Sequence, residues 1–494
     1  MTAPVPFDVA VIGGGAAGCV VARRLSESGQ RVILLEAGPD PGDRPPGEWH
    51  DGWHLPTLPD WGFEAEPADT GPATRLRRGR LLGGTSWLTR FAVRGAAADF
   101  DAWAAQGNPG WSFADVLPAF RRLESDAEFS ADPWHGDGGP IPVTRYPGLA
   151  PSAIHAAGLE AFLGVGVPAI DDHNAPAAIG VGRLPMSSRD GVRATTADAY
   201  LPRSGRPASL EIRTDAPVAA VLLDGTRATG VRLVDGTRIP AGRVIVSAGT
   251  YGSPAILMRS GIGPAGHLRS VGIDALVDLP GVGANLVDHP GVDLDSGWRG
   301  AAAGGPVLHS IATLRSAAAP PGGAPDLMFW ISDPDGEAPG LWLDPILLKP
   351  QSRGSVVLRS ADPTAPPRIT LPGVREPADV ERLIEAYARG LEVANRPEIR
   401  RLATDPPPSE PKTPEDWRRR IIENAYSIPH VVGTCAMGPS PADGAVVDAL
   451  GRVHGVDGLW VVDASIIPVP PAGFPHLVTI MLAEHLSERL TARR

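Results

Sequence analysis

The stretch Phe7–Gly18, FDVAVIGGGAAG, decides the fold of this chain. Its first half is a mostly apolar run, as in a strand buried in a parallel sheet. Its second half, from Gly13, has the spacing G-x-G-x-x-G. Ala16–Ser28 then has helical spacing and stops before a glycine, and Arg31–Glu36 is a second apolar run. These elements predict a βαβ unit of about thirty residues, with the glycine-rich turn between the first strand and the helix.

The glycine-rich turn has the chemistry of a dinucleotide site. Gly13 permits a tight turn, Gly15 lets the backbone approach a pyrophosphate, and Gly18 allows close packing of the helix on the strand. The helix N-terminus offers N–H groups and the positive end of its dipole. Glu36 ends the second strand, where a carboxylate accepts both ribose hydroxyls and repels a 2′-phosphate, so FAD and NAD remain and NADP is disfavoured. The predicted cofactor-binding residues of this unit are Gly13, Gly15, Ala16, Ala17, Gly18, Glu36 and Ala37.

A pattern between residues 217 and 249 favours FAD over NAD. The short runs PVAAVLLDG, ATGVRLVDG and TRIP are β-like, and Asp-Gly pairs at Asp224 and Asp235 divide them, which predicts an antiparallel meander. RVIVSAG (Arg243–Gly249) then has the apolar run of a strand that returns to the main sheet. This order suits an FAD-binding domain better than a compact NAD domain. We expect α/β plus α+β architecture: a Rossmann-like FAD-binding domain with a meander, and a substrate-binding cap domain.

Length and charge narrow the class of function. A chain of 494 residues exceeds the size of one hydrophobic core, which predicts two domains. The net charge of −11 gives no basic footprint for nucleic acid. Four arginines cluster, and two interpretations of them stay open: a solvated loop, or a loop beside a bound phosphate. They are Arg75, Arg77, Arg78 and Arg80.

The sequence indicates neither a metal site nor a membrane span. Cys19 and Cys435 are far apart and form no C-x-x-C motif. Asp171–Asn174 resembles a metal cluster only by composition, because no third spaced ligand element accompanies it. No secretory signal is visible, and polar residues and prolines interrupt the longest apolar stretch, Leu459–Ala483. We therefore expect a cytoplasmic protein; its oligomeric state stays open.

Five further motifs follow one another along the chain. They are RLLGGTS from Arg80, the stretch Gly249–Gly263, GVGANLVDHP from Gly281, HVVGTCAMG from His430 and GLWVVDASIIP from Gly458. In this order they resemble the glucose–methanol–choline (GMC) oxidoreductases. The resemblance implies FAD as cofactor, a small-molecule alcohol as substrate, and oxygen or another carrier as electron acceptor.

The resemblance also implies where FAD is held. Gly79–Thr89 is similar to the segment that runs along the pyrophosphate and isoalloxazine, Val218 matches the residue whose backbone meets adenine, and Asp463-Ala464 resembles the ribityl contact. Some relatives link FAD covalently through a histidine near the position of Leu88, and leucine has no nucleophile, so non-covalent FAD is expected. The residues implied are Arg80, Gly83, Gly84, Thr85, Leu88, Thr89, Val218, Asp463, Ala464, His476 and Leu477.

Within that stretch Trp87-Leu88-Thr89 replaces the usual Ala-Ile-Asn, which predicts a changed pocket shape. Low aromatic content argues against an aromatic-lined pocket, but three tryptophans are candidates to face it: Trp87, Trp330 and Trp342.

Two histidines match the family's catalytic positions, His430 and His476. Alcohol oxidation removes the hydroxyl proton and passes a hydride from the same carbon to flavin N5, and a neutral histidine suits the first task. We expect His430 to be the general base and His476 to orient the hydroxyl. A helix start at His476 would lower its pKa through the positive end of the dipole. His289 is expected only to fix a loop.

The expected domain bounds are 1–155, 190–290 and 430–494 for FAD binding, and 156–189 and 291–429 for substrate binding. Two alternatives to an alcohol oxidase or dehydrogenase stay open. One is a non-redox lyase of the hydroxynitrile type that keeps FAD. The other is an inactive flavoprotein that serves as a binding partner.

Overall fold

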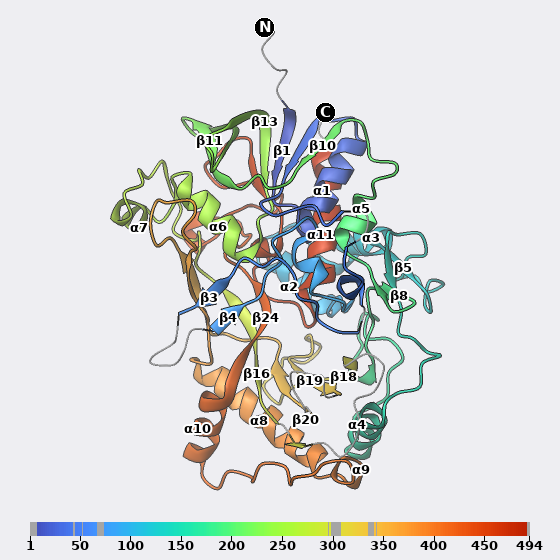
Figure 1. Cartoon of the computed structure of the whole chain (residues 1–494). Helices are drawn as coiled ribbons and strands as arrows, with labels where there is room; N and C mark the ends of the chain where they lie inside the picture. The colour runs from blue at the N-terminus through green and yellow to red at the C-terminus, as the bar shows by residue number, and fades with distance from the viewer. Residues whose placement is uncertain are drawn as a thin grey trace.

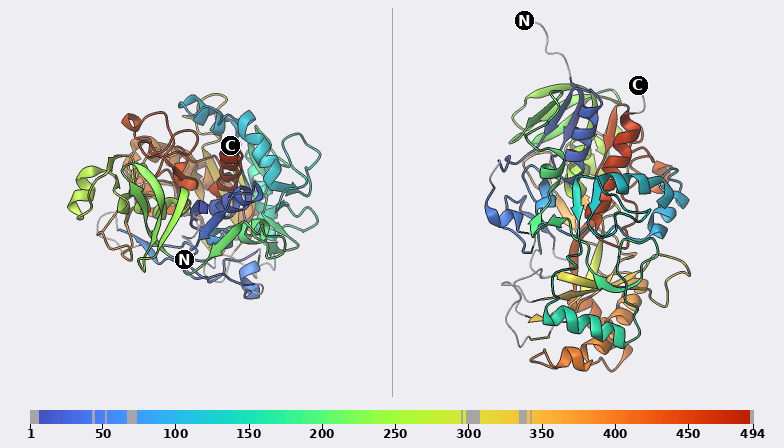
Figure 2. Two further views of the ribbon diagram at one scale, coloured as in Figure 1. Left: turned by 90° about the horizontal axis from the view of Figure 1, so that it is seen from above. Right: turned by 90° about the vertical axis from the view of Figure 1, so that its right-hand side faces the viewer.

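The structure is a computed structural model, and it describes residues 7–42, 45–51, 53–66, 74–294, 296–297, 308–333, 340–341 and 343–491. Two lobes follow one another along the long axis of the molecule (Figure 1). The lobe with both termini holds β1, β10, β11 and β13, and the opposite end holds α4, α8, α9 and α10; Figure 2 shows the same division from the side.

The predicted βαβ unit is present. Strand β1 (Phe7–Ile12), helix α1 (Ala16–Glu27) and strand β2 (Val32–Leu35) follow in order. The strands pair in parallel, with Val9 opposite Val32, and every residue of β2 is buried. The continuous apolar runs are therefore those of inner strands covered on both faces.

The main sheet has seven strands in the order β10-β2-β1-β13-β12-β11, with β25 also paired to β13. The predicted meander is present as β11, β12 and the first half of β13. The expectation of two separate strands at TRIP and RVIVSAG is wrong, because both belong to β13. The change from an alternating to a continuous apolar pattern marks the point where this one strand passes from the half-exposed meander to the buried centre, between β1 and β25. The bounds are β10 (Leu210–Arg213), β11 (Val218–Asp224), β12 (Arg227–Leu233), β13 (Arg238–Val246) and β25 (Leu459–Val461).

The closing helix α11 (Pro475–Thr491) runs through the core of this lobe beside α1 and α3 (Phe113–Leu123). It carries a buried carboxylate, Glu484, whose Oε1 lies 2.7 Å from Nη2 of Arg24 and accepts a hydrogen bond from the Tyr200 hydroxyl at 2.8 Å. Each charge therefore has a partner, as buried ionic groups require. Unlike a surface helix, α11 is buried along most of its length. Its first turn lies at the junction of the lobes.

The second lobe is built on a six-stranded antiparallel sheet in the order β24-β16-β21-β19-β18-β7. The stretch Val374–Asn395 has charged and apolar residues at helical spacing, which predicts an amphipathic helix, and it contains α8. This helix packs on β21 through a buried stripe that includes Leu383 and Tyr387. The bounds are β7 (Gly180–Arg183), β16 (Val287–Val292), β18 (Leu308–Leu314), β19 (Leu327–Ser332), β21 (Pro345–Leu347), β24 (Ala425–Val432), α4 (Ala153–Gly164), α8 (Pro377–Ala394), α9 (Pro397–Arg400) and α10 (Pro414–Asn424).

A four-stranded sheet joins distant parts of the sequence in the order β22-β23-β3-β4. Its strands are β3 (Phe63–Ala65), β4 (Thr74–Leu76), β22 (Ser355–Val357) and β23 (Arg368–Thr370). We propose the domain division given above, with β16 and β24 crossing its boundaries. The stretch Ala301–Pro306, whose Gly- and Pro-rich composition predicts a loop, lies outside the described residues.

The remaining elements are short and lie mostly at the junction and the periphery. They are η1 (Gly47–His50), η2 (Gly84–Trp87), α2 (Ala97–Ala105), β5 (Glu124–Asp126), β6 (Ile141–Val143), β8 (Ser188–Arg189), β9 (Val192–Arg193), α5 (Thr196–Tyr200), α6 (Gly249–Arg259), β14 (Ile262–Gly263), α7 (Ala265–Ser270), β15 (Val277–Asp278), β17 (Ser296–Gly297), β20 (Gly340–Leu341), η3 (Pro441–Asp443) and η4 (Ala464–Ile466). Among the described residues, no helix has the length and apolar character needed to cross a membrane.

Candidate active site

One long cavity of about 650 Å³ lies where the two lobes meet. It is lined by the glycine-rich turn and Glu36, and also by His430, His476, Phe91, Trp330 and Phe474. The part of the cavity around these last five residues is called the chamber. The cavity therefore joins the carboxyl ends of the parallel strands, where dinucleotides bind in open α/β sheets, to one face of the second sheet.

Gly13 and Gly18 have the local structural roles predicted for them, and Gly15 leaves the open space that its predicted role requires. Gly13 has φ +97°, and an added Cβ would lie 2.5 Å from the carbonyl oxygen of Ser247. At Gly18 a Cβ would lie 1.8 Å from the carbonyl oxygen of Gly13, so the helix packs directly on the turn. Gly15 lines the cavity, and a Cβ there would meet no atom within 4 Å. The open space at Gly15 and the start of α1 form a cradle that fits a pyrophosphate.

Glu36 follows strand β2 and lines the cavity, as predicted. Its Oε2 accepts a hydrogen bond from Gly14 N at 2.8 Å, and its Oε1 accepts one from Gly38 N at 2.8 Å. Burial raises the pKa of the carboxyl to about 7 in spite of these two donors. Each carboxylate oxygen keeps a further lone pair for a ribose hydroxyl.

The segment from Arg80 to Thr89 lies along the glycine-rich turn. Gly83 N donates to Gly14 O at 2.7 Å, and a Cβ on Gly84 would lie 2.8 Å from the Cα of Gly15. This close contact explains Gly84, because a side chain there would separate the two segments, whereas Gly83 has φ +98° and a Cβ on it would lie 2.5 Å from Nε1 of Trp87. The members of the segment that line the cavity are Gly84, Thr85, Ser86, Leu88 and Thr89.

Asp463, in the last of the five motifs, connects that motif to the start of helix α6. Its Oδ2 accepts hydrogen bonds from Gly249 N at 2.9 Å and from the Ser253 hydroxyl at 2.5 Å, and its Oδ1 accepts one from Ser465 N at 2.8 Å. Burial raises the pKa of this carboxyl. Asp463 and Ala464 both line the cavity, and so does Val218 at the start of β11.

Four predicted cofactor contacts do not line the cavity. Gly18 and Gly83 pack behind it, and Arg80 is exposed, with its guanidinium 5.2 Å from the Trp61 ring centre. Leu477 is fully buried in the main core, because the second and third residues of a helix point in different directions. The residues that do line the cavity fit FAD: a phosphate cradle with a carboxylate at one end and a broad chamber at the other.

His430 and His476 line the same chamber. His430 lies in strand β24 and His476 in the first turn of α11, and Phe474 stands beside the first of them, with ring centres 4.9 Å apart. Burial and then the charge of Arg78 lower the pKa of His430 to about 3. Burial and then the charge of Arg193 lower the pKa of His476 to about 4. Both imidazoles are therefore neutral near pH 7, with burial as the largest cause at each, and the contribution of the helix dipole at His476 stays a prediction.

His476 also has an unused polar atom. Its Nε2 is buried and has no hydrogen-bond partner among the described residues. A buried ring nitrogen that faces a cavity in this way fits a polar group of a ligand.

Sequence reasoning left the role of the arginine cluster open and gave His289 no part in the site. Arg77 and Arg78 line the cavity, whereas Arg75 is exposed beside Asp60, so both interpretations of the cluster stay open. His289 is fully buried in strand β16, and its Nδ1 lies 3.1 Å from Nδ1 of His430, so it does not merely fix a loop. The signal for His289 was its place in the motif GVGANLVDHP.

The aromatic lining differs from the expectation. Trp87 does not line the cavity; its ring packs against Trp49 and His50, and its Nε1 donates to Leu82 O at 2.9 Å. Trp330 lines the chamber together with Phe91 and Phe474. An aromatic-lined chamber is thus present despite the low aromatic content, because packing brings the few rings together. Trp342 lies outside the described residues.

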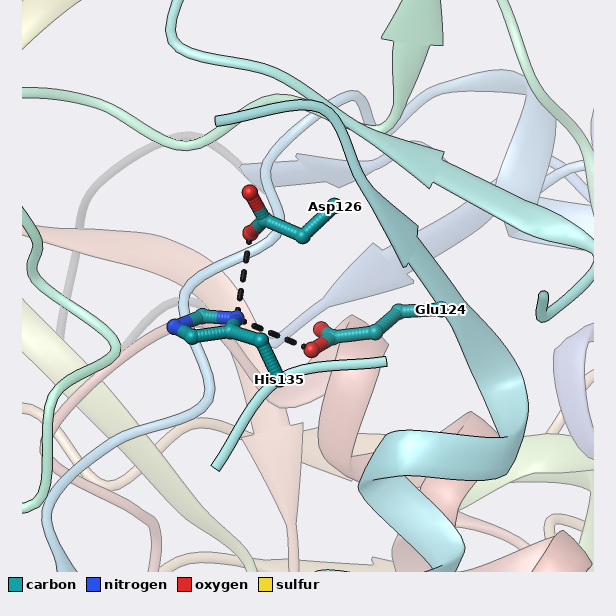
Figure 3. Close-up of side chains that lie close together, drawn as sticks. All are labelled: Glu124, Asp126 and His135. Atoms are coloured by element: carbon teal, nitrogen blue, oxygen red, sulfur yellow. Dashed lines mark hydrogen bonds and ion pairs between the residues drawn. The ribbon is translucent and has the colours of Figure 1, made fainter. Parts of the chain in front are cut away.

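A second group of ionisable side chains lies outside the cavity, around His135. Glu124, Asp126 and His135 have ligand atoms within 4.8 Å of one another, as in a metal site (Figure 3). Nδ1 of His135 lies 3.0 Å from Glu124 and 3.1 Å from Asp126, and its Nε2 lies 3.1 Å from Asp172. Hydrogen bonds to Asp126, Asp172 and Glu124 outweigh burial and raise the pKa of His135 to about 10.

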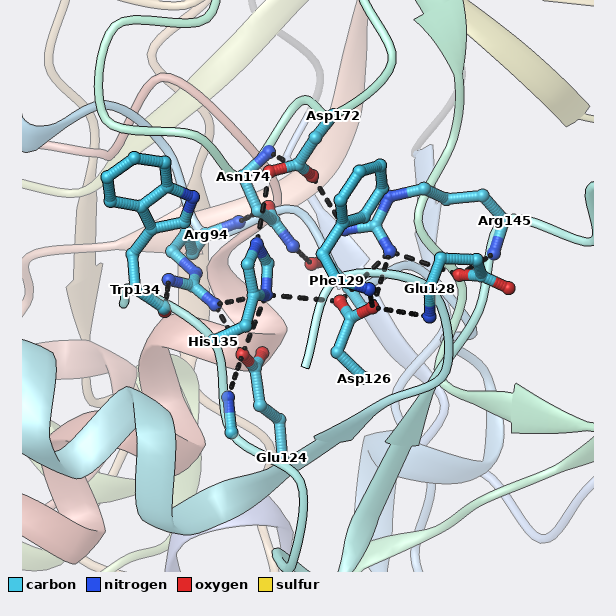
Figure 4. Close-up of polar contacts among 12 residues, drawn as sticks. Arg94, Glu124, Asp126, Glu128, Phe129, Trp134, His135, Arg145, Asp172 and Asn174 are labelled. Atoms are coloured by element: carbon cyan, nitrogen blue, oxygen red, sulfur yellow. Dashed lines mark hydrogen bonds and ion pairs between the residues drawn. The ribbon is translucent and has the colours of Figure 1, made fainter. Parts of the chain in front are cut away.

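Two arginines complete this group (Figure 4). Arg94 lies 2.6 Å from Glu124, and Arg145 lies 2.9 Å from Asp126 and 2.6 Å from Asp172. With two guanidinium groups and a protonated imidazole on the same carboxylates, the group is an ion-pair network rather than a cation site. The network links Asp172, which belongs to the stretch Asp171–Asn174, to the C-terminal end of helix α3.

The fold and the site together define the class of flavin-dependent oxidoreductases. A dinucleotide-binding sheet and a second sheet lie across one long cavity, and two neutral histidines line its chamber. Comparison with protein-family models agrees with this class. Models described as GMC oxidoreductase match residues 7–291 and 350–483. The chain therefore belongs to the GMC oxidoreductase family and is an FAD-dependent alcohol oxidoreductase.

Individual relatives extend over nearly the whole chain. It is similar to 5-(hydroxymethyl)furfural oxidase of Methylovorus sp. (strain MP688), with 35% identity over 98% of each chain. It is also similar to oxygen-dependent choline dehydrogenase of Sinorhizobium fredii, with 34% identity over 99% of this chain and 96% of the relative. Among solved structures, pyridoxine 4-oxidase from Mesorbium loti has a TM-score of 0.91 and 30% identity, over 99% of this chain and all of that one.

Proposed function

We propose that this protein oxidises the CH–OH group of a small alcohol to an aldehyde or ketone, with His430 as the general base and His476 as the group that orients the hydroxyl. The observation that carries the proposal is that both imidazoles line one chamber of the cavity and both have lowered pKa values. A neutral imidazole is the form that accepts a proton.

FAD is bound non-covalently in this proposal, because Leu88 has no nucleophile for a covalent link. The residues that hold it are Gly13 and Gly15 of the turn, Glu36, Asp463-Ala464, and Gly84, Thr85, Leu88 and Thr89 of the following segment, all of which line the cavity. When bound, FAD supplies the acceptor, at its N5, for the hydride from the alcohol carbon.

The remaining steps belong to the protein. The alcohol hydroxyl donates to Nε2 of one histidine and accepts from the other, which places its carbon in the chamber. His430 takes the hydroxyl proton, and general-base catalysis of this kind contributes about 10²–10⁴-fold to the rate. Burial and then the positive charge of Arg78 lower the pKa of His430, so the proton is easily released again in the next step. Phe91, Trp330 and Phe474 exclude water from this end.

The chamber favours an aromatic or otherwise apolar primary alcohol. Phe91 and Phe474 are 4.8 Å apart at their ring centres, and Phe474 and Trp330 are 6.3 Å apart and stacked, so flat rings surround the space beside His430. Offset and edge-on contacts with such rings favour a flat aromatic group. The chain is similar to 5-(hydroxymethyl)furfural oxidase and to pyridoxine 4-oxidase, and this similarity supports the same substrate class.

Anaerobic reduction of the FAD-loaded protein tests this proposal. A panel of aryl alcohols, aliphatic alcohols, aldehyde hydrates and sugars is mixed with the protein without oxygen, and the visible flavin absorbance is followed. Bleaching by an aryl alcohol, faster than by a sugar, supports the proposed substrate class. If nothing in the panel bleaches the flavin, the dehydrogenation proposal fails, and turnover of a cyanohydrin with the flavin still oxidised would favour the lyase.

The electron acceptor is tested in the same experiment. Oxygen or an artificial quinone is added to the bleached protein, and the rate at which the absorbance returns is compared between them. Faster recovery with oxygen identifies an oxidase, and recovery only with the quinone identifies a dehydrogenase.

A further inference from the structure

The chamber has a buried positive charge beside its aromatic rings. Arg90 lines the cavity and is only 6% exposed. The Cζ atom of its guanidinium lies 4.9 Å from the centre of the Phe91 ring. Phe91 lies 4.8 Å from Phe474, and Phe474 lies 4.9 Å from His430, each measured between ring centres. Two aromatic rings therefore connect the guanidinium to the proposed base.

Among the described residues, arginines outnumber acidic residues in the lining of the cavity. The acidic residues are Glu36 and Asp463, and both accept hydrogen bonds from backbone N–H groups. The arginines are Arg77, Arg78, Arg90 and Arg259. A guanidinium keeps its charge in proteins, so the cavity is positive although the whole chain has a net charge of −11. A positive cavity in an acidic protein favours an anionic ligand.

A second buried guanidinium, that of Arg193, lies close to Arg90. Arg193 donates hydrogen bonds to the carbonyl oxygens of Thr89 and Asp51, each at 2.8 Å, and of His54 at 2.7 Å, so it fixes the backbone that directly precedes Arg90. Burial and then the charge of Arg90 lower the pKa of Arg193 to about 9, and Asp51 opposes this shift. The two like charges therefore repel each other, and an anion bound at Arg90 reduces the repulsion.

The other arginines that line the cavity are tied to backbone carbonyl oxygens. Arg77 donates to Pro56 O at 2.8 Å, Arg78 to Pro429 O at 3.2 Å and Arg259 to Ala365 O at 3.0 Å. Arg90 instead lies over the face of a ring that belongs to the chamber. Arg90 is therefore the arginine that a substrate beside the two histidines is expected to meet.

A carboxylate is the anion that matches a single guanidinium. Two parallel N–H donors of an arginine fit its two oxygens, in the same plane. A carboxylate that enters among Phe91, Trp330 and Phe474 loses its water, and pairing with Arg90 offsets that cost. The flat rings beside the guanidinium favour an aromatic group as the carrier of the carboxylate.

We propose that Arg90 is a specificity-determining residue that binds a carboxylate of the substrate, so that the preferred alcohol is a hydroxymethyl arene with an acid group on the same ring. This inference rests on the proposed function, which supplies the oxidation of the hydroxymethyl group. The carboxylate is unchanged in the reaction. It holds the aromatic ring between the Arg90 guanidinium and the two histidines.

Binding of unreactive acids tests the carboxylate site without turnover. The FAD-loaded protein is titrated in a calorimeter with para-toluate, meta-toluate and the corresponding amides, which have nearly the same shape but no charge. We expect the better acid to bind about 10–100-fold more tightly than its amide, as for one charge-assisted bidentate pair. Arg90→Gln should remove this preference. Equal affinities of acid and amide in the unsubstituted protein would overturn the proposal, whether or not the protein oxidises alcohols.

The same comparison is made with the alcohols in anaerobic flavin reduction, after the FAD content of each variant has been measured. We expect para- or meta-hydroxymethylbenzoate to exceed its amide by about 10–100-fold in kcat/KM, mainly through KM, because the acid group is remote from the reacting carbon. Arg90→Gln should remove this preference, and Arg90→Lys should keep part of it, since lysine retains the charge but not the planar fork. An equal loss for acid and amide in Arg90→Gln, with the preference retained, would show that Arg90 serves the cofactor or the fold instead.

An arginine outside the cavity serves as the control. Arg183 in β7 donates to the carbonyl oxygens of Tyr146 at 2.6 Å and Leu149 at 3.0 Å and does not line the cavity. Arg183→Gln removes the same charge from the protein and is expected to leave the preference for the acid unchanged. A loss of preference in Arg183→Gln as large as in Arg90→Gln would overturn the proposal, because net charge would then decide it. Tight binding of the toluates without flavin reduction by any alcohol would keep the carboxylate site and reject the proposed oxidation.

Discussion

Asp463 accepts a hydrogen bond from the backbone N–H of Gly249 at 2.9 Å, across 214 positions of the sequence. The contact joins the last motif of the chain to the start of helix α6, and both residues line the cavity. One buried carboxylate thus holds two walls of the cofactor site together.

Removing this carboxylate tests how far it supports the site. Asp463→Ala leaves the N–H of Gly249 and the hydroxyl of Ser253 without their acceptor, and each such buried donor costs about 1–3 kcal/mol. We expect a lower melting temperature and lower FAD content after purification. Asp463→Asn keeps one acceptor oxygen and should lose less of both. Equal losses in the two variants would contradict the role given to the hydrogen bonds.

Two alanine substitutions in the glycine-rich turn should have opposite consequences. Gly15 has φ −82° and open space at its Cβ position, so Gly15→Ala should fold normally but project a methyl group into the cofactor cradle. Gly18→Ala puts a methyl group 1.8 Å from the backbone oxygen of Gly13 and should destabilise the fold. Thermal unfolding of the FAD-free protein and FAD titration distinguish them. A normal FAD affinity in Gly15→Ala would show that the cofactor does not approach this glycine.

The two chamber histidines should differ in their effect on flavin reduction. We expect His430→Ala to lose about 10²–10⁴-fold in the anaerobic reduction rate, because the base is removed. His476→Ala should lose less, because it removes only the group that orients the hydroxyl. Stopped-flow absorbance at saturating alcohol measures both, with the FAD content determined beforehand. A larger loss in His476→Ala would exchange the two assignments.

The pH dependence of flavin reduction follows from the lowered pKa values of the same residues. With the pKa of His430 at about 3 and that of His476 at about 4, both are already deprotonated well below neutral pH. The rate should therefore be flat between about pH 5.5 and 8, whereas a histidine of ordinary pKa, about 6.5, would lose activity over that range. A rate that falls tenfold per pH unit below about 6.5 would contradict the neutral pair.

The ion-pair network around His135 predicts how stability depends on pH. The folded-state pKa of about 10 is raised above the unfolded value, so this stabilisation is fully present below about pH 6.5 and is lost as the pH rises through 10. His135→Gln breaks a buried charged network, at a cost of about 3–5 kcal/mol at neutral pH. Melting temperatures of the unsubstituted protein and of His135→Gln from pH 6 to 10 measure this loss of stability. The difference between the two melting temperatures should become smaller toward pH 10. A constant gap would mean that His135 is not protonated in the folded protein.

Much of the cofactor lobe could be predicted from local patterns. The βαβ unit, the separate roles of Gly13, Gly15 and Gly18, and the place of Glu36 after β2 all follow from periodicity and turn geometry within thirty or so neighbouring residues. Local sequence carries this information because strand burial, helix spacing and glycine conformations depend mainly on adjacent residues. The prediction of two separate strands on either side of Arg243 was wrong. A change from alternating to continuous apolar residues within one strand gives the same sequence pattern as a gap between two strands.

By itself, the sequence determined the dinucleotide-binding unit and, through its motifs, the family and the two candidate histidines. Only the tertiary structure decided that His289 contacts His430, that Trp87 turns away from the cavity, and that Asp126, His135 and Asp172 share a network. These contacts join residues from separate segments, so they depend on how the lobes pack and not on the neighbours of each residue. The same packing excludes water from the histidines, and that burial is the first cause of the lowered pKa values on which the proposed chemistry depends.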